Sequence, residues 1–467
     1  MIYDGIVRHV VFPAAQALIG GGTLSLIQEW ERTQWLSPAE LRALQLGKLR
    51  RMLIHAGLRV PFYRETFRRT GFVPENVTSV DDLAALPILD KTVLRERARD
   101  FIAEGVFERM FIARTGGSTG EPLAFPVGNT LRAGAVANMV RCRRWWGIEA
   151  GDRSANIWGH SRYIRRRRGD GVRKAASTAK ARLLNRIVLS AYDLSDGSMS
   201  RYWERIMVFR PAFVIGYATS LYTFADFIAR RRLDGGALGL KAVISTAEVL
   251  YDWQEEVISA AFGAPVVNEY GMCEAGILAY QCPEGSMHCM DESCLIEILP
   301  IAGCESGDIV VTELDNLAAP LIRYNTKDMA RRMDGRCSCG RGLSRISRVE
   351  GRAYDTVYSC SGEVVAGALL THVMKSVAKV RKYQILQRSL NDIEVKYMES
   401  RPLDSADRDF ITGTLKRHLG ADVNVTLVRV DDMPVELSGK HRWIRSLIGR
   451  SAAAGAETPG EVKETVE

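Results

Sequence analysis

No apolar run in this 467-residue sequence is long enough to cross a membrane. The least polar stretch, Val10 to Leu26, is interrupted by Pro13, Gln16 and three consecutive glycines, and we expect a buried or surface-lying helix there. It also lacks the basic lead-in and small-residue cleavage pattern of a signal peptide. We therefore predict no transmembrane segment, and the chain length favours two or more domains.

A disulfide framework is missing as well. The nine cysteines are an odd number spread over a long chain, unlike the dense, paired cysteines of small secreted proteins. We expect reduced thiols and a cytoplasmic location, with a subset of the cysteines available for metal binding.

Acidic residues are scarce in one segment. Between His160 and Arg186 there are ten Lys/Arg, including Arg165–Arg168, and a single acid, Asp170. This segment alone carries +9 and the whole chain +8, so the remainder is nearly neutral. Because Tyr163 is its one aromatic residue, we predict no nucleic-acid partner. A solvated loop and a binding site for phosphate or for an acidic partner both stay open.

The loop Thr115–Pro122 holds three glycines, two threonines and a serine. Glycine lets several backbone N–H groups point the same way, and hydroxyls add uncharged donors, so the loop suits phosphate oxygens. It lacks the Gly-Lys-Ser/Thr ending of a P-loop NTPase. An ordinary turn is the alternative.

Helices dominate before this loop, where Ser37-Pro38-Ala39-Glu40 predicts a capped helix through Leu53 and Asp90 is a candidate N-cap. After the loop, strands and helices alternate, which favours an α/β fold with a parallel sheet. Expected strands are 155–159, 212–217, 240–245 and 265–270; expected helices are 131–146, 220–230 and 251–262.

Ligands of parallel sheets gather beyond the carboxyl ends of the strands. Residues at those ends are therefore our candidates for the wall of a substrate pocket: Trp158, His160, Gly216, Tyr217 and Ala247. Each has an ordinary structural alternative, and a lone histidine such as His160 is more often a hydrogen-bonding residue than a catalyst. This mixture of aromatic and small residues suits an aromatic or medium-sized ligand.

The expected secondary structure changes twice further along the chain. Alternating strands are expected at 294–299 and 308–312. Past Gly351 a small α+β unit is expected, with helices at 370–380 and 404–419 and strands at 382–387, 392–397 and 423–428. We predict a large domain over residues 1–352, a small mobile domain over 353–448 and a disordered tail over 449–467.

Four segments in this order resemble the adenylate-forming superfamily, in particular its phenylacetate–CoA ligase and capsule-biosynthesis (CapK-type) family. They are the Thr115–Pro122 loop, Asn268–Glu274, Arg323–Asp328, and Gly351-Arg352 followed by Ser438-Gly439-Lys440. The resemblance runs from about Gln34 to Ser446. It implies a large N-terminal α/β domain and a small mobile α+β C-terminal domain.

The resemblance also implies ATP and Mg²⁺ as cofactors. Tyr270 would stack on adenine, Glu274 would hold Mg²⁺, and Asp328, with Arg352 nearby, would accept hydrogen bonds from ribose. Lys440 would reach the charge that develops between the carboxylate and the α-phosphate. The other residues implied to bind ATP are Thr115, Gly116, Gly117, Ser118, Thr119, Gly120, Glu248 and Gly271.

Three positions depart from the family pattern. Leu123 follows the loop proline where many members have lysine, Lys327 replaces a turn glycine, and Tyr354-Asp355 stands in place of an acidic pair. These changes leave ATP binding intact as an expectation but put the second half-reaction in question, because that step needs the C-terminal domain to swing. The acceptor is therefore CoA, an amine or a carrier-protein thiol.

Cys282, His288, Cys337 and Cys339 form the ligand set of a tetrahedral Cys₃His zinc site. Some relatives have a structural zinc at a similar place. Cys-x-Cys is a less usual spacing than Cys-x-x-Cys, and Cys289 or Cys294 are alternative ligands.

The expected protein is an AMP-forming acid–thiol or acid–amine ligase that makes an acyl-adenylate and pyrophosphate. A nucleotide-binding homologue without activity is the alternative, motivated by Tyr354 and Lys327, although Glu274 and Lys440 are both present. The identity of the acid is not encoded in these motifs, and a homodimer is an open alternative to a monomer.

Overall fold

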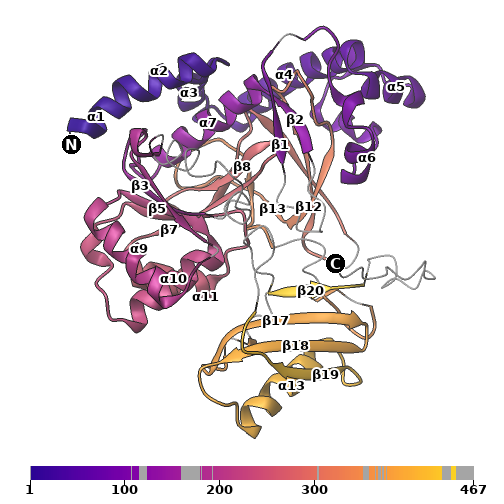
Figure 1. Cartoon of the computed structure of the whole chain (residues 1–467). Coiled ribbons are helices and arrows are strands. Elements are labelled where there is room, and N and C mark those ends of the chain that lie inside the picture. Colours follow the sequence, from indigo (N-terminus) through magenta and orange to yellow (C-terminus); the bar gives the residue numbers. More distant parts are fainter. Residues whose placement is uncertain are drawn as a thin grey trace, which may run out of the picture.

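The computed structural model describes residues 2–106, 108–114, 124–158, 179, 181–191, 193–301, 304–350, 357–362, 364–365, 370, 373–374, 376–433 and 443–448. Figure 1 shows a large domain with a smaller one below it, and in both views the smaller domain lies next to α10 and α11. The fold is α/β, as the sequence predicts.

Helices form the N-terminal part of the large domain. The predicted capping box opens α4: Ser37 Oγ accepts from Glu40 N at 3.3 Å, and Glu40 Oε2 accepts from Ser37 N at 2.8 Å. Asp90 caps α6 through a 2.9 Å bond from Thr92 N. These elements are α1 (Ile2–Ile6), η1 (Val7–Val11), α2 (Phe12–Ile19), α3 (Thr23–Thr33), α4 (Pro38–Arg59), α5 (Pro61–Thr70), η2 (Pro74–Asn76), η3 (Val80–Ala85), α6 (Lys91–Glu96) and η4 (Ala98–Phe101).

The centre of the large domain is a nine-stranded sheet of order β13-β14-β9-β8-β7-β6-β5-β3-β4. Neighbours from β7 through β4 pair in parallel, and those from β7 to β13 are antiparallel. The strands are β3 (Ser154–Trp158), β4 (Arg186–Ser190), β5 (Phe213–Tyr217), β6 (Ala242–Thr246), β7 (Val266–Met272), β8 (Gly276–Gln281), β9 (Met287–Cys289), β13 (Arg332–Met333) and β14 (Arg345–Ile346).

Both faces of the parallel strands are buried, which explains their unbroken apolar sequences. In β6, Val243 packs with α9, α10 and α11, whereas its neighbours Ala242 and Ile244 pack on the opposite face, in the cluster that includes Cys142 of α7. These helices are α7 (Asn129–Arg144), α9 (Asp196–Phe209), α10 (Ala218–Arg230) and α11 (Asp252–Phe262); the short η6 (Gly236–Leu238) precedes β6.

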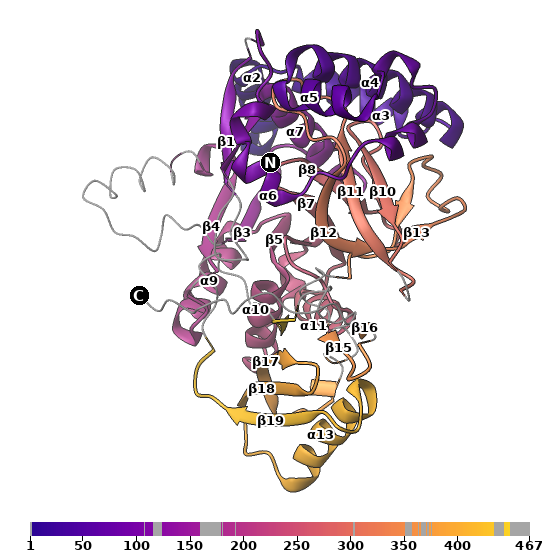
Figure 2. The same ribbon diagram turned by 90° about the vertical axis from the view of Figure 1, so that its right-hand side faces the viewer.

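Two smaller sheets complete the large domain. The strands β1 (Met110–Arg114) and β2 (Ala124–Gly128) form an antiparallel pair whose connection is the glycine-rich loop. The strands β10 (Cys294–Leu299), β11 (Gly307–Glu313) and β12 (Tyr324–Ala330) form an antiparallel sheet, seen at the right in Figure 2.

The small domain is built on a four-stranded sheet of order β19-β18-β17-β20 with its own apolar core. Its elements are β17 (Val380–Ser389), β18 (Asp392–Glu399), α13 (Ser405–Leu419), β19 (Asn424–Arg429) and β20 (Ile444–Ser446); the pair β15 (Val357–Tyr358) and β16 (Val364–Val365) precedes them. The helix expected over 370–380 does not extend that far, because residues 376–379 form turns and β17 starts at Val380.

Candidate active site

The carboxyl ends of β5, β6 and β7 lie at one edge of the sheet. Tyr217 pairs with Thr246 across β5 and β6, and Thr246 pairs with Glu269 across β6 and β7. The register therefore brings the predicted strand-end residues to a common edge, next to Tyr270. Parallel pairing aligns the strand ends in this way because every strand enters the sheet from the same side.

Tyr270 and Asp328 are in direct contact although 58 positions separate them. The Tyr270 hydroxyl donates to Asp328 Oδ2 at 2.9 Å and lies 3.3 Å from Thr326 Oγ1, whose oxygen also accepts from Asp328 N at 3.1 Å. Strand β12 thus presents a carboxylate to the aromatic residue at the end of β7. The structure brings together the two residues implied to bind adenine and ribose.

Two buried carboxylates lie near this edge. Glu274, two residues beyond β7, is almost fully buried. Burial, together with a smaller contribution from the negative charge of Glu274, raises the pKa of Glu313 in β11 to about 8. Hydrogen bonds from Leu321 N and the Asn316 amide, each 2.9 Å, hold Glu313 in place. A carboxylate such as that of Glu274 suits a hard divalent cation such as Mg²⁺. Glu313 was not predicted from the sequence.

Glu248 lies just after β6, where it accepts a hydrogen bond at 2.8 Å from the backbone N–H of Thr219. Thr219 is in the first turn of α10, where a carboxylate is stabilised by the free N–H groups and the helix dipole. The preceding residue, Ala247, has φ +65°, a left-handed conformation that is uncommon for a residue with a Cβ. Such strain is concentrated at functional sites.

The candidate substrate pocket has an aromatic pair. The rings of Trp158 and Tyr217 lie 4.7 Å apart, inclined by 39°, at the ends of neighbouring strands β3 and β5. Gly216 serves strand packing, since a Cβ there would meet the Ile157 carbonyl oxygen at 2.9 Å. His160 lies outside the described residues.

Lys327 occupies a position that favours glycine, with φ +63°. Its ammonium lies 2.6 Å from Asp90 Oδ2, and both side chains are partly exposed. The same Asp90 caps α6, so this ion pair ties the helix to the ribose-motif strand β12. Lysine in place of the family's glycine therefore adds backbone strain at this position, but it gains an ion pair between β12 and the start of α6.

Replacing Lys327 by glycine is expected to change the free energy of unfolding by less than about 1 kcal/mol, because relief of left-handed strain offsets an exposed ion pair. Lys327→Ala keeps the strain and loses the ion pair, so it should be about 1 kcal/mol less stable than Lys327→Gly. Urea unfolding of the two variants measures this difference. Equal stabilities would show that the backbone at this position relaxes.

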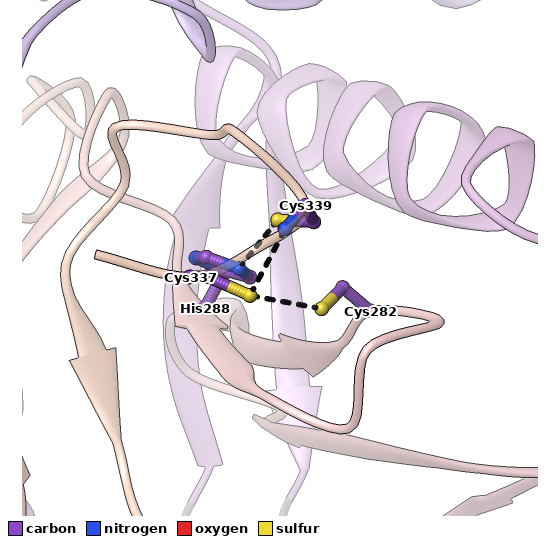
Figure 3. A group of neighbouring side chains, drawn as sticks. All are labelled: Cys282, His288, Cys337 and Cys339. Atoms are coloured by element: carbon purple, nitrogen blue, oxygen red, sulfur yellow. Dashed lines mark hydrogen bonds between the residues drawn. The ribbon is translucent and has the colours of Figure 1, made fainter.

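The predicted cysteine and histidine ligands form one group within the described part of the chain. Their ligand atoms all lie within 4.8 Å of one another, as Figure 3 shows for Cys282, His288, Cys337 and Cys339. Cys282 Sγ and Cys337 Sγ are 3.7 Å apart, and Cys339 Sγ is 3.2 Å from His288 Nε2. Tetrahedral zinc with Zn–S bonds of about 2.3 Å requires sulfur atoms about 3.8 Å apart. Cys289 and Cys294 lie outside the group.

Neighbouring residues orient His288 and fix the loop that carries Cys337 and Cys339. His288 Nδ1 is 3.2 Å from the Leu343 carbonyl, which leaves Nε2 directed at the cluster, and burial lowers the pKa of His288 to about 4, so the imidazole stays neutral. Asp291 fixes the adjacent loop by accepting from both Ser344 N and Ser344 Oγ at 2.6 Å. The cluster therefore joins β9 to the 334–344 loop.

The two domains meet through aromatic side chains. Trp253 of α11 packs edge-on against Trp443, with ring centroids 5.5 Å apart, and Trp443 also contacts Tyr383 at 4.8 Å. Burial lowers the pKa of Lys382 in β17, partly offset by the charges of Asp432 and of Glu248 across the interface. The C-terminal domain thus reaches the active-site edge. No sequence motif marks this contact.

Several predicted residues lie outside the described part of the structure. They are the loop residues Thr115 to Gly120 with Leu123, the basic residues Arg165–Arg168, Arg352, Tyr354, Asp355 and Lys440. Their roles remain predictions. The described strands β1 and β2 bracket the loop.

Comparison with known proteins agrees with this architecture. Residues 357–446 match the family model described as the CapK C-terminal domain. A phenylacetate-coenzyme A ligase of Pseudomonas putida is 26% identical over 417 residues, covering 83% of this chain and 89% of its own. Protein CapK of Staphylococcus aureus is 23% identical, covering 82% and 84%.

Solved structures share the fold. A 2-hydroxyisobutyryl-CoA ligase in the postadenylation state matches with a TM-score of 0.72 and 20% identity, over 89% of this chain and 91% of that one. The TM-score falls to 0.58 against an open conformation of the same ligase.

The fold and these matches show that the chain is similar, over most of its length, to proteins of the adenylate-forming superfamily. Within that group, the match of residues 357–446 and the curated relatives place the resemblance in the phenylacetate–CoA ligase and CapK-type family.

Proposed function

We propose that this chain is an AMP-forming ligase that activates a carboxylic acid with ATP. The carboxylate oxygen attacks the α-phosphorus, an acyl-adenylate forms and pyrophosphate leaves. The observation that carries the proposal is the 2.9 Å contact between Tyr270 and Asp328 at the sheet edge where Glu274 lies buried. Relatives named phenylacetate-coenzyme A ligase support it.

The reaction brings two anions together, so positioning and charge neutralisation supply most of the rate. Asp328 would accept hydrogen bonds from ribose hydroxyls while Tyr270 covers the adenine face. Glu274, with Glu313 beside it, would hold Mg²⁺, which supplies positive charge near the phosphates. Glu248, fixed by Thr219 N, would complete the nucleotide site.

Charge at the reacting atoms would come from the C-terminal domain. Lys440 would neutralise the developing charge between carboxylate and α-phosphate, and the Thr115–Gly120 loop would bind the β- and γ-phosphates. The aromatic contact between Trp253 and Trp443 supports an arrangement in which this domain closes on the active-site edge. Closure also excludes water, which would otherwise hydrolyse the adenylate.

In the second half-reaction a nucleophile attacks the acyl carbonyl carbon and AMP leaves. CoA is the favoured acceptor because several relatives are named CoA ligases. An amine or a carrier-protein thiol is the alternative. The Trp158–Tyr217 pair supports an aromatic or medium-sized acyl group.

A structural zinc is part of the proposal. The Cys₃His group has the ligand types and spacing of a closed tetrahedral site, and its Cys282 follows β8, whereas Glu274 precedes that strand. The nine cysteines of the chain are free of disulfide bonds in the structure. We retain a cytoplasmic location as a prediction.

Acid-dependent exchange of labelled pyrophosphate into ATP tests the first half-reaction. With a panel of aromatic and aliphatic acids, we expect exchange that requires one class of acid and Mg²⁺. Lys440→Ala should reduce this exchange by at least about a hundredfold while retaining ATP binding. Exchange that persists at the wild-type rate in this variant would contradict the assigned role of Lys440.

A further inference from the structure

The charged residues of the first helical segment of the chain face the large domain. Helices α1, η1 and α2 follow one another without a break from Ile2 to Ile19. Arg8 forms an ion pair of 2.9 Å with Asp152, and Asp4 accepts a 2.8 Å hydrogen bond from Asn185. Val7 is buried between these contacts. The face that contacts the protein therefore combines the charged Asp4 and Arg8 with the apolar Val7 and Phe12.

The outward face of the same segment is apolar. Tyr3, Ile6, Val10 and Leu18 are 44%, 45%, 61% and 85% exposed, and Ala14 and Ala17 are exposed between them. Their spacing of three or four residues places them on one side of a helix. No Asp, Glu, Lys or Arg occurs from His9 to Gln28. This pattern is the reverse of an ordinary surface helix, whose polar side faces solvent.

A further apolar side chain continues this face. The Tyr3 hydroxyl donates to the Leu183 carbonyl at 3.2 Å, and Leu183 is itself 51% exposed. Its neighbour Arg182 is exposed as well. In the sequence, Arg182 ends a stretch that carries nine Lys/Arg from Arg162 onward against one acid. An apolar face with the positive charge of Arg182 beside it is complementary to an anionic lipid surface.

We propose that Tyr3, Ile6, Val10, Leu18 and Leu183 form a surface that lies on the headgroup region of an anionic membrane. Figure 1 shows α1 and α2 at the outer edge of the large domain, away from the C-terminal domain. Docking there leaves the active-site edge accessible. This attachment is independent of the ligase activity proposed above.

The surface lies on the membrane and does not span it. Among the described residues no single helix is long and apolar enough to cross a bilayer, and the pair Tyr3–Ile19 and Thr23–Thr33 qualifies only when taken together, with a bend of 108°. Crossing would require α3 to leave the large domain. Trp30 and Ile27 of α3 are buried against Ala137 and Val140 of α7, so that helix is part of the core.

Flotation of the full-length chain with vesicles tests the proposal. We expect binding to vesicles of phosphatidylcholine with about one third phosphatidylglycerol, weaker binding to phosphatidylcholine alone, and loss of binding in high salt. The triple variant Ile6→Asn, Val10→Asn, Leu18→Asn should reduce the bound fraction at least tenfold. Val208→Asn, at an 87% exposed position of α9, is the matched control and should bind as the wild type does.

Circular dichroism and thermal unfolding of each variant show whether the fold is retained, and Ile6→Asn alone provides a milder change if the triple variant unfolds. Vesicle binding that is equal in the wild type and the folded variants would overturn the proposal. Absence of vesicle binding, together with a dimer that the triple variant dissociates in analytical ultracentrifugation, would assign the face to a second copy of the chain instead.

Discussion

Replacing Cys337 by serine is expected to remove bound zinc and to lower the free energy of unfolding by more than about 4 kcal/mol. The reason is that the metal would join the Cys282 turn, His288 of β9 and the loop around Cys337 and Cys339, segments that lie up to 57 positions apart in the sequence. Serine retains the size of the side chain but binds zinc poorly, and the remaining thiolates would lose their charge partner.

Total-metal analysis of protein purified without chelator, followed by urea unfolding, measures both effects. We expect one zinc per chain in the wild type and none in Cys337→Ser. Cys304→Ser makes the same chemical change at a partly exposed position outside the cluster, and it should keep zinc and change stability by less than about 0.5 kcal/mol. A wild-type chain without zinc would contradict the proposed site.

Replacing Glu274 by glutamine is expected to reduce acid-dependent pyrophosphate exchange by about a hundredfold to a thousandfold, because the amide keeps the shape of the side chain but loses the negative charge that would hold Mg²⁺. Stability should not fall, since the substitution removes the charge that contributes to the raised pKa of Glu313. The variant thereby separates a catalytic defect from misfolding.

Exchange rates at several Mg²⁺ concentrations provide the measurement. A defect that high Mg²⁺ partly restores is the signature we expect of a weakened metal site. Glu305→Gln is the control, because that side chain is exposed in an ion pair with Arg331 and lies outside the site. Full exchange activity in Glu274→Gln would show that another group binds the metal.

Local signals in the sequence predicted the elements that depend on neighbouring residues. The capping box of Ser37 and Glu40 and the Asp90 N-cap are visible in a few consecutive letters, because their hydrogen bonds close within three residues. The strands β5, β6 and β7 are also readable, since burial on both faces leaves unbroken apolar runs. The candidate pocket residues at the strand ends were predicted from the same apolar runs, because each of them lies where such a run ends.

Contacts between distant segments were predictable only where chemistry restricts the partners. The Cys₃His cluster was predicted because few residue types bind zinc, whereas the Trp253–Trp443 contact joins ordinary aromatic residues 190 positions apart. The strand β4 has a short apolar run after a basic segment, and α9 begins with a mostly polar turn, so neither was predicted. The antiparallel half of the sheet, from β8 to β13, depends on pairing that no local pattern specifies.

Formation of an acyl-adenylate by this chain is tested most directly by acid-dependent exchange of pyrophosphate into ATP. ATP binding is measured in parallel. We expect exchange with at least one class of carboxylic acid and dependence of this exchange on Mg²⁺. The Lys440→Ala variant should lose exchange but still bind ATP. A chain that binds ATP and catalyses no exchange with any acid would contradict the claim and identify a nucleotide-binding homologue without ligase activity.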